Sequence, residues 1–164
     1  MKTLLVLRHA KSSWHHGTLV DHERPLNERG QREAPQMGKV IREYRLVPDV
    51  LLSSDACRAR QTAEAVTRAA HFAGEIRLEP RLYGASPAEI IGVLRTVDVT
   101  NAATVLIVGH NPGLEELVAR LTRERQELPT AALAQIVLTV DQWRDLTVSS
   151  RGSLIGLWRP KELV

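Results

Sequence analysis

Hydrophobic residues along the chain occur in two patterns that alternate with each other. Short continuous apolar runs are typical of buried strands, whereas longer stretches with an apolar residue every three to four positions are typical of helices with one buried face. The continuous runs predict strands at residues 3–8, 49–53, 76–79, 104–108, 133–140 and 153–158.

The first predicted helix has apolar residues at helical spacing, namely Ala34, Met37, Ile41 and Tyr44. Asn27 precedes this stretch and is of a residue type that caps helix N-termini. Pro35 lacks a backbone N–H, so we expect either a kink at Pro35 or a regular helix that begins there. Further helices are predicted within residues 59–70, after Ser86 with Pro87 at the first helical position, and within residues 114–121.

Strands that alternate with helices indicate an α/β fold. We expect a three-layer α/β/α sandwich, in which a mainly parallel sheet has helices on both faces. The 164 residues show no repeat and no linker, which predicts a single domain over residues 1–164. In such sheets ligands bind outside the carboxyl ends of the strands, so chemistry is expected at that edge.

Composition narrows the class of protein. Hydrophobic residues make up 43% and charged residues 25% of the chain, as in ordinary soluble proteins. No apolar run approaches the roughly 20 residues that span a bilayer, so no membrane partner is expected. The net charge is only +3, and basic and acidic residues are interspersed, which gives nucleic-acid binding little support.

The N-terminal apolar run and the cysteine content bear on the compartment. The run ends in the polar pair Arg8-His9 instead of a small-residue cleavage site, so we interpret it as a strand and not as a signal peptide. Cys57 is the only cysteine, which excludes an internal disulfide and suits a cytoplasmic location. The chain lacks cysteine and histidine pairs at zinc-ligand spacing, so no metal is expected.

Polar residues of unusual type follow three of the predicted strands. Arg8 and His9 end the first strand, Ser54 and Arg58 follow the second, and His110 follows the strand at 104–108. Because parallel strands end at one edge of the sheet, these side chains should converge there.

Histidines and arginines at one site are suited to phosphoryl groups. A phosphate carries about −1.5 to −2 charges near neutral pH, and arginine forks match its oxygens. A neutral imidazole is a competent nucleophile, so one histidine could attack phosphorus while the other groups stabilise the charge. Each residue also has a structural alternative: the Arg8-His9 pair could lie in a solvated loop, His110 could be a polar turn residue, and Arg58 could pair with Glu64. Their joint placement after three predicted strands favours a site for a phosphoryl group.

The remaining residues of interest have ordinary structural interpretations. We expect surface or loop positions for His15, His16, His22 and His71. Cys57 is expected to be a structural thiol, and the tryptophans are expected to pack against the sheet or its margins.

Several segments resemble a known family. LRHAKSSW, SSDACRARQTA and VGHNPGLEEL resemble the three motifs of the histidine phosphatase (phosphoglycerate mutase-like) superfamily. HERPLNERG, RLYGAS, LPTAAL and the closing WRPKEL are similar to the SixA-type phosphohistidine phosphatases within it. The resemblance covers nearly the whole chain in the same order.

The resemblance implies a role at each matching position. His9 would be the nucleophile that becomes phosphorylated, and Arg8 and Arg58 would clamp the phosphoryl oxygens. His110 would contact the same oxygens, and Arg24 would be a further arginine of the phosphate pocket. No metal and no organic cofactor is implied.

The sequence departs from the family pattern in two ways. Ala10 replaces the usual glycine after the histidine, which is tolerable where the backbone φ is negative. The usual general acid is missing, because Asn111 stands where one branch has aspartate and Gly84 lies near the place of the other branch's glutamate. The remaining acid candidates are Asp21, Glu79 and Glu89.

The missing acid favours a substrate whose leaving group needs little protonation, and the imidazole of phosphohistidine meets that requirement. The sequence therefore predicts a monomeric phosphatase that acts on a phosphohistidine-bearing protein through a phospho-His9 intermediate. The alternatives are a phosphatase for small phosphomonoesters and a non-catalytic phosphate or phosphoprotein sensor. A mutase is disfavoured, because the short chain leaves little sequence for a cap that would exclude water.

Overall fold

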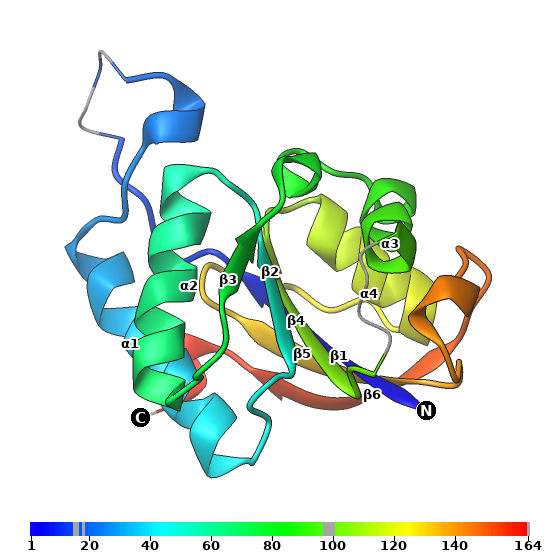
Figure 1. Cartoon of the computed structure of the whole chain (residues 1–164). Coiled ribbons are helices and arrows are strands. Elements are labelled where there is room, and N and C mark those ends of the chain that lie inside the picture. Colours follow the sequence, from blue (N-terminus) through cyan, green and yellow to red (C-terminus); the bar gives the residue numbers. More distant parts are fainter. Residues whose placement is uncertain (15–16, 18, 97–100, 164) are drawn as a thin grey trace.

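One sheet forms the centre of the molecule (Figure 1). The computed structural model describes residues 1–14, 17, 19–96 and 101–163. Within these residues six strands pair in the order β3-β2-β4-β1-β5-β6. Their bounds are β1 Lys2–Arg8, β2 Val50–Ser53, β3 Ile76–Leu78, β4 Thr104–Gly109, β5 Leu133–Leu138 and β6 Gly152–Trp158. The first four strands run parallel, whereas β5 and β6 are antiparallel to their neighbours, so the predicted mainly parallel sheet is confirmed.

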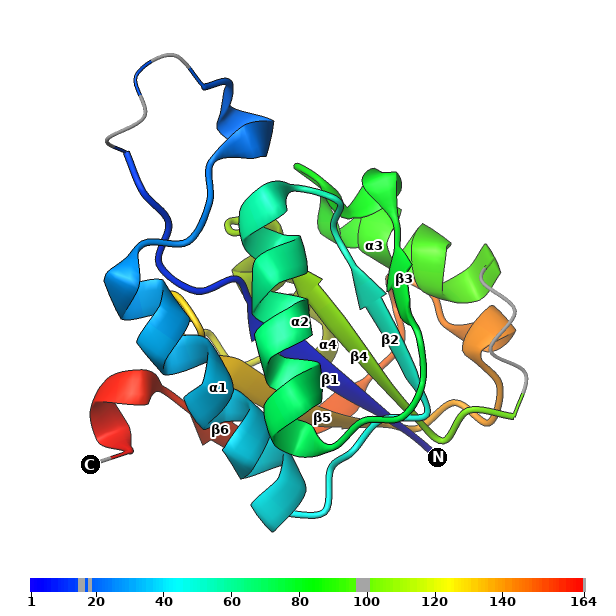
Figure 2. The same cartoon turned by 60° about the vertical axis from the view of Figure 1, so that its left-hand side comes forward.

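Helices cover both faces of this sheet, as Figures 1 and 2 show together. α1 (Glu28–Glu43) and α2 (Cys57–Ala70) lie on one face, and α3 (Pro87–Thr96) and α4 (Gly113–Thr122) lie on the other. Short 3-10 turns complete the described structure: η1 Asp21–Glu23, η2 Pro80–Leu82, η3 Trp143–Asp145 and η4 Pro160–Glu162. The three-layer α/β/α arrangement predicted from the alternating patterns is therefore present.

The central strands are buried on both faces, which explains their continuous apolar runs. Successive side chains of a strand point to opposite faces of the sheet. In β1, Leu5 and Leu7 pack into the core shared with α1 and α2, whereas Leu4 and Val6 pack into the core shared with α3 and α4. This double burial anchors β1, the strand from which the Arg8-His9 pair emerges.

The helix starts follow the expected capping chemistry. The side chain of Asn27 accepts a hydrogen bond from the Gly30 N–H at 2.9 Å and so caps α1. At the start of α3, Ser86 Oγ accepts from the Glu89 N–H at 3.2 Å and Glu89 Oε1 accepts from the Ser86 N–H at 3.0 Å. These reciprocal bonds form a capping box.

Two details of the first helix differ from the prediction. α1 begins at Glu28 and contains Pro35, so the predicted alternative of a regular helix that begins at Pro35 is wrong. The cap at Asn27 sets the start upstream, and the helix continues through the proline. Tyr44 does not share the buried face: it is 59% exposed at the C-terminal end of α1, where its ring lies 5.1 Å from that of Trp158.

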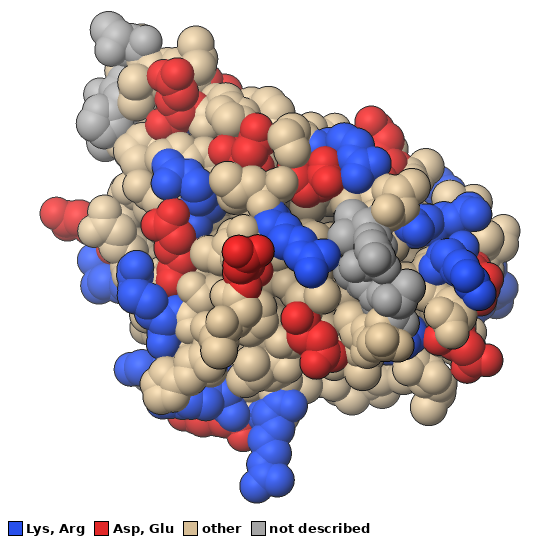
Figure 3. All heavy atoms as spheres, in the orientation of Figure 1, with Lys and Arg blue, Asp and Glu red and all other residues tan. Residues whose placement is uncertain are grey.

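The described helices and surface charges bear on whether a membrane or a nucleic acid is a partner. In the described ranges no helix combines the length and the apolar character that crossing a membrane requires. Figure 3 shows basic and acidic side chains interspersed over the face that it displays, without a continuous basic patch among the described residues.

Candidate active site

The ends of β1 and β4 and the start of α2 bring three predicted residues together. The rings of His9 and His110 lie 5.2 Å apart, and Arg58 Nε lies 3.4 Å from His9 Nε2. His9 is 7%, Arg58 6% and His110 9% exposed, so the group is buried at the carboxyl edge of the sheet. The convergence expected from a parallel sheet is present.

The hydrogen bonds of His9 define which ring nitrogen is free to react. Nδ1 lies 2.7 Å from the carbonyl oxygen of Ala10. A carbonyl only accepts, so Nδ1 carries the proton and Nε2 keeps its lone pair toward Arg58. Burial, together with the nearby His110 and arginine charges, lowers the pKa of His9 to about 3. The ring is therefore neutral and nucleophilic at neutral pH.

The backbone around His9 is fixed on both sides. The His9 N–H donates to the Gly109 carbonyl at 3.1 Å, and the Ala131 N–H donates to the His9 carbonyl at 3.0 Å. Ala10 is buried and has a negative φ, and its N–H donates to Thr62 Oγ1 at 2.9 Å. The methyl group that replaces the family's glycine is thus accommodated, as the sequence analysis required.

Asp21 links the two arginines of the pocket. Its Oδ1 accepts from Arg24 Nε at 3.1 Å, and its Oδ2 accepts from Arg58 Nη2 at 3.0 Å and from the Tyr83 hydroxyl. Arg24 also donates to Ser12 Oγ at 2.6 Å and is only 7% exposed. The carboxylate of Asp21 therefore holds the guanidinium groups that the family resemblance assigns to the phosphoryl oxygens.

Arg8 and His110 each have one buried nitrogen atom without a partner. Arg8 Nη1 donates to the Leu128 carbonyl at 3.0 Å, whereas Arg8 Nε makes no hydrogen bond. His110 Nε2 lies 2.8 Å from Ser54 Oγ, whereas His110 Nδ1 makes none. Burial, followed by the charge of Arg58, lowers the pKa of His110 to about 4, so this ring is also neutral at neutral pH.

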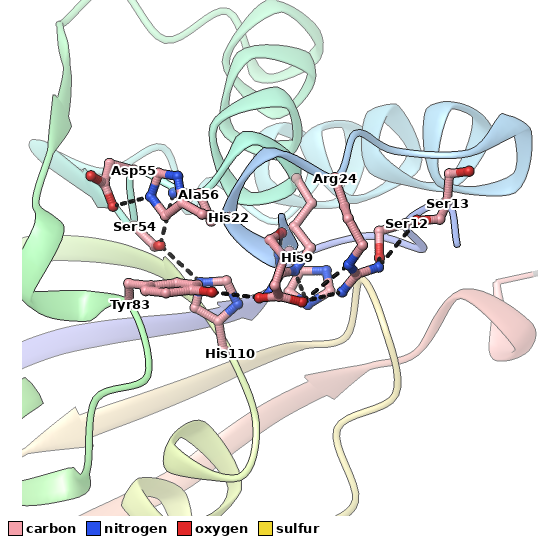
Figure 4. Close-up of polar contacts among 12 residues, drawn as sticks. His9, Ser12, Ser13, His22, Arg24, Ser54, Asp55, Ala56, Tyr83 and His110 are labelled. Carbon is pink, nitrogen blue, oxygen red and sulfur yellow. Dashed lines mark hydrogen bonds and ion pairs between the residues drawn. The ribbon is translucent and has the colours of Figure 1, made fainter. Parts of the chain in front are cut away.

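Tyr83 lies beside His110 and His22, on the side of the site where Ser54 and Asp55 lie, as the close-up in Figure 4 shows. The Tyr83 ring lies edge-on to His110 at 5.4 Å and to His22 at 4.9 Å. His22 Nε2 lies 2.9 Å from Asp55 Oδ1. The sequence predicts an ordinary surface or loop position for His22 and gives no functional role to Tyr83. The position of Tyr83 beside Gly84, near the expected place of a family glutamate, was the available signal.

Trp14 differs from the packing role expected of the tryptophans. It is 70% exposed, and the guanidinium carbon of Arg24 lies 3.5 Å from its ring centroid. Trp143 is buried, as expected for packing. Trp14 thus stacks on a pocket arginine at the open side of the site.

The other acid candidates are held by neighbours outside the two-histidine centre. Glu79 pairs with Arg81 at 2.8 Å, and Glu89 belongs to the capping box of α3. Asn111 Nδ2 donates to Glu115 Oε1 and to the Leu128 carbonyl, both at 2.9 Å. Asn111 therefore connects the segment before α4 to the loop that follows α4 and contains Leu128.

The structural alternative for Arg58, an ion pair with Glu64, is wrong. Glu64 pairs with Arg60 at 3.2 Å, one turn along α2, whereas Arg58 faces the pocket and pairs with Asp21. His71 lies at the exposed C-terminal end of α2 and contacts Arg42, as expected for a surface position. The predictions for His15 and His16 fall outside the described residues.

The arrangement is suited to binding and transferring a phosphoryl group. It combines a neutral imidazole whose Nε2 is free, arginine forks and a second neutral imidazole, and these groups can accept phosphorus and stabilise its oxygens. Among the described residues, no three histidine, cysteine, aspartate or glutamate side chains are grouped to hold a metal ion. The geometry thus gives His9 as the candidate nucleophile and the arginines with His110 as the candidate clamp.

Comparison with known proteins identifies the family. The histidine phosphatase superfamily (branch 1) matches residues 4–86, half of the chain. An uncharacterized protein of Mycobacterium tuberculosis is 33% identical over 94% of this chain and its own full length. The chain belongs to the histidine phosphatase superfamily, which confirms the resemblance of its motifs and supports phosphatase activity.

Solved structures give the same assignment. A proposed phosphohistidine phosphatase SixA from Nakamurella multipartitia is similar with a TM-score of 0.85 and 28% identity, over 97% of this chain and 96% of that one. A second, from Agrobacterium tumefaciens, has a TM-score of 0.80 and 30% identity, over 97% and 98% of the two chains. The SixA-type fold predicted from the sequence is therefore confirmed.

Proposed function

We propose that this protein hydrolyses phosphohistidine in a protein substrate through a covalent phospho-His9 intermediate. The observation that carries the proposal is the pair of hydrogen bonds at the two ring nitrogens of His9. The Ala10 carbonyl fixes the proton on Nδ1, and the unprotonated Nε2 accepts from Arg58 Nε–H at 3.4 Å. The likeness to proposed SixA phosphohistidine phosphatases supports the substrate class.

The reaction proceeds in two displacements. In the first, the His9 Nε2 lone pair forms a bond to phosphorus while the bond from phosphorus to the substrate imidazole breaks. The bonding electrons remain on the leaving nitrogen, and the substrate ring, which carries a proton on its other nitrogen, leaves as neutral imidazole. In the second, water attacks the phosphorus of phospho-His9, releases inorganic phosphate and returns the electron pair to Nε2, while the proton of water passes to solvent or phosphate. Arg8, Arg58 and Arg24 offset the negative charge in both steps.

None of the three acid candidates, Asp21, Glu79 and Glu89, has a pKa raised toward neutral pH, which supports an N-phosphoryl substrate. The hydrogen bond from Tyr83 and the bonds and charges of Arg24 and Arg58 hold the pKa of Asp21 well below its usual range. Asp21 is therefore ionised and accepts hydrogen bonds without a proton to give. An alkoxide, whose parent pKa lies near ~15.7, needs protonation to leave, whereas imidazole, with a pKa near ~6.5, needs far less help.

A sensor that only binds phosphate is the alternative from another functional class. Binding alone needs the arginines but gives no reason for a buried neutral His9 with its Nε2 kept free. The test is a brief incubation with a phosphohistidine protein labelled on its phosphoryl group. Acid-labile label on the wild type that disappears in His9→Ala supports the proposal. Tight binding of the donor without any labelled enzyme favours the sensor.

A panel of leaving groups separates the two phosphatase alternatives. Phosphohistidine protein, phosphohistidine peptide, an aryl phosphate and an alkyl phosphate are compared at one pH and one salt concentration. We expect kcat/KM to fall steeply from phosphohistidine to the alkyl ester, by about the 10²–10⁴-fold that a general acid normally contributes. Comparable turnover of the alkyl ester and phosphohistidine would contradict the proposed substrate.

A further inference from the structure

The hydroxyl group of Ser54 lies between two nitrogen atoms behind His110 (Figure 4). Ser54 follows β2 and is 0% exposed. Its Oγ lies 3.2 Å from the backbone nitrogen of Ala56 and 2.8 Å from His110 Nε2. A backbone N–H only donates, so Oγ is the acceptor in its bond with Ala56.

The single hydroxyl proton of Ser54 determines the tautomer of His110. Among the described contacts of Ser54 Oγ, His110 Nε2 is the atom that can accept this proton. A proton on Nε2 would leave both the Ser54 hydroxyl hydrogen and the Nδ1 lone pair buried without partners. A buried polar group without a partner destabilises the fold, so the better-satisfied arrangement places the imidazole proton on Nδ1.

The resulting Nδ1–H group of His110 faces the reaction centre. In Figure 4 this nitrogen lies on the side of the ring that faces His9, and the two ring centroids are 5.2 Å apart. His110 Nδ1 and Arg8 Nε are the two buried side-chain atoms without a hydrogen-bond partner in the part of the chain described. Buried donors are nearly always paired in native proteins, so two unpaired donors beside a nucleophile indicate an acceptor that arrives with the substrate.

We propose that Ser54 is a positioning residue, which holds neutral His110 in the Nδ1–H tautomer so that the ring donates a hydrogen bond to a phosphoryl oxygen. The inference rests on the proposed function, because it takes the phosphoryl group on His9 as the acceptor. No proton is transferred from His110, and Ser54 itself touches no reacting atom.

The two histidines are thus given opposite tasks by their neighbours. A carbonyl group, from Ala10, fixes the proton of His9 on Nδ1 and leaves Nε2 as the nucleophile. A hydroxyl group, from Ser54, donates to His110 Nε2 and leaves Nδ1–H as a donor. Both rings are neutral and carry their proton on Nδ1, so the nitrogen that faces the reaction centre, and not the charge, distinguishes the attacking ring from the stabilising one.

The first test measures the tautomer directly in the wild-type protein. With ¹⁵N-labelled histidine, NMR at pH 7 should show His110 with a protonated Nδ1 and an unprotonated Nε2. This measurement needs no substrate and no variant. A His110 that carries its proton on Nε2 would overturn the proposal, whatever the enzyme's activity.

The second test compares Ser54→Ala with Ser53→Ala. Ser53 is also 0% exposed, and its hydroxyl donates to the Ser54 carbonyl at 2.8 Å without touching His110. Ser54→Ala should give a mixture of His110 tautomers and lower kcat about 10–100-fold, less than the 10²–10³-fold typical of removing a donor outright. Ser53→Ala should keep the wild-type tautomer. An unchanged tautomer in Ser54→Ala, or a changed one with full kcat, refutes the assignment.

A double-mutant cycle separates positioning from general stability. His110→Asn places an amide N–H near the position of Nδ1 and has no tautomers, so Ser54→Ala should have little further effect on kcat in that background. Losses that simply add would show a structural role instead. If the wild type turns over no phosphoryl compound, the proposed function fails, while the NMR result still decides the tautomer that Ser54 imposes.

Discussion

The contact between Asp21 and the pocket arginines predicts that one substitution improves phosphate binding. Asp21 contributes a carboxylate where a phosphoryl group would place its oxygens, on Arg24 and Arg58. A phosphoryl group that uses the same guanidinium forks must displace this carboxylate. Asp21→Asn keeps the size of the side chain and removes its negative charge, so the competing contact weakens.

The size of the effect follows from the exposure of the pair. The Asp21 side chain is 47% exposed, and its ion pairs with Arg24 and Arg58 measure 3.1 and 3.0 Å. Exposed ion pairs contribute about 0.2–1 kcal/mol each, so the two pairs together give about 0.4–2 kcal/mol. Because 1.4 kcal/mol corresponds to tenfold in affinity, phosphate should bind about 2–30-fold more tightly to Asp21→Asn.

The assay is calorimetric titration with inorganic phosphate at fixed pH and salt, supported by inhibition with orthovanadate. Asp55→Asn is the matched control, because Asp55 pairs with His22 and contacts neither arginine. We expect a much smaller change for this control. Equal or weaker binding by Asp21→Asn would refute the reasoning, since Asp21 would then hold the arginines in place for the phosphoryl group instead of competing with it.

Three further predictions concern the charge, the clamp and the fold. Burial lowers the pKa values of His9 and His110 to about 3 and about 4, so both rings should stay neutral between pH 8 and pH 5 in an NMR titration. Titration of either ring near its ordinary pKa of about 6.5 would contradict this. Arg58→Lys keeps the charge but loses the guanidinium fork and the Nε–H contact with His9 and should lower kcat/KM about 10²–10³-fold, whereas Arg60→Lys, with its partner on the surface, should not. Asn27→Ala removes the cap of α1 and should lower the free energy of unfolding by about 0.5–2 kcal/mol in urea titrations, and an unchanged midpoint would show that the cap contributes nothing.

The elements of the fold were predictable where burial imposes a period on the sequence. β1 and β4 are buried on both faces and appear as continuous apolar runs, and the face of α4 that packs on the sheet appears as Leu114, Leu117, Val118 and Leu121. Strand order was not predictable, because an apolar run does not indicate which strands lie beside it in the sheet or in which direction it runs. Tyr44 shows the same limit, since helical spacing continues past the point at which the core ends.

The site was predictable where its residues directly follow strands. Arg8, His9 and His110 extend from β1 and β4, so the parallel sheet alone places them together. Arg24 lies in an irregular segment and was identified through family resemblance. Tyr83 also lies outside regular structure, where no period shows which side chains face inward, and its contact with the pocket depends on tertiary packing.

The carboxylates near the pocket explain why the site should discriminate between leaving groups. The Tyr83 hydroxyl, ahead of the arginines, lowers the pKa of Asp21; Arg81 lowers that of Glu79; hydrogen bonds at the start of α3 lower that of Glu89. A general acid at neutral pH needs the opposite, a pKa raised toward 7. The contacts that order these segments therefore keep each carboxyl group ionised. An alkoxide leaving group finds no proton among these three carboxyl groups, whereas an imidazole can leave without one.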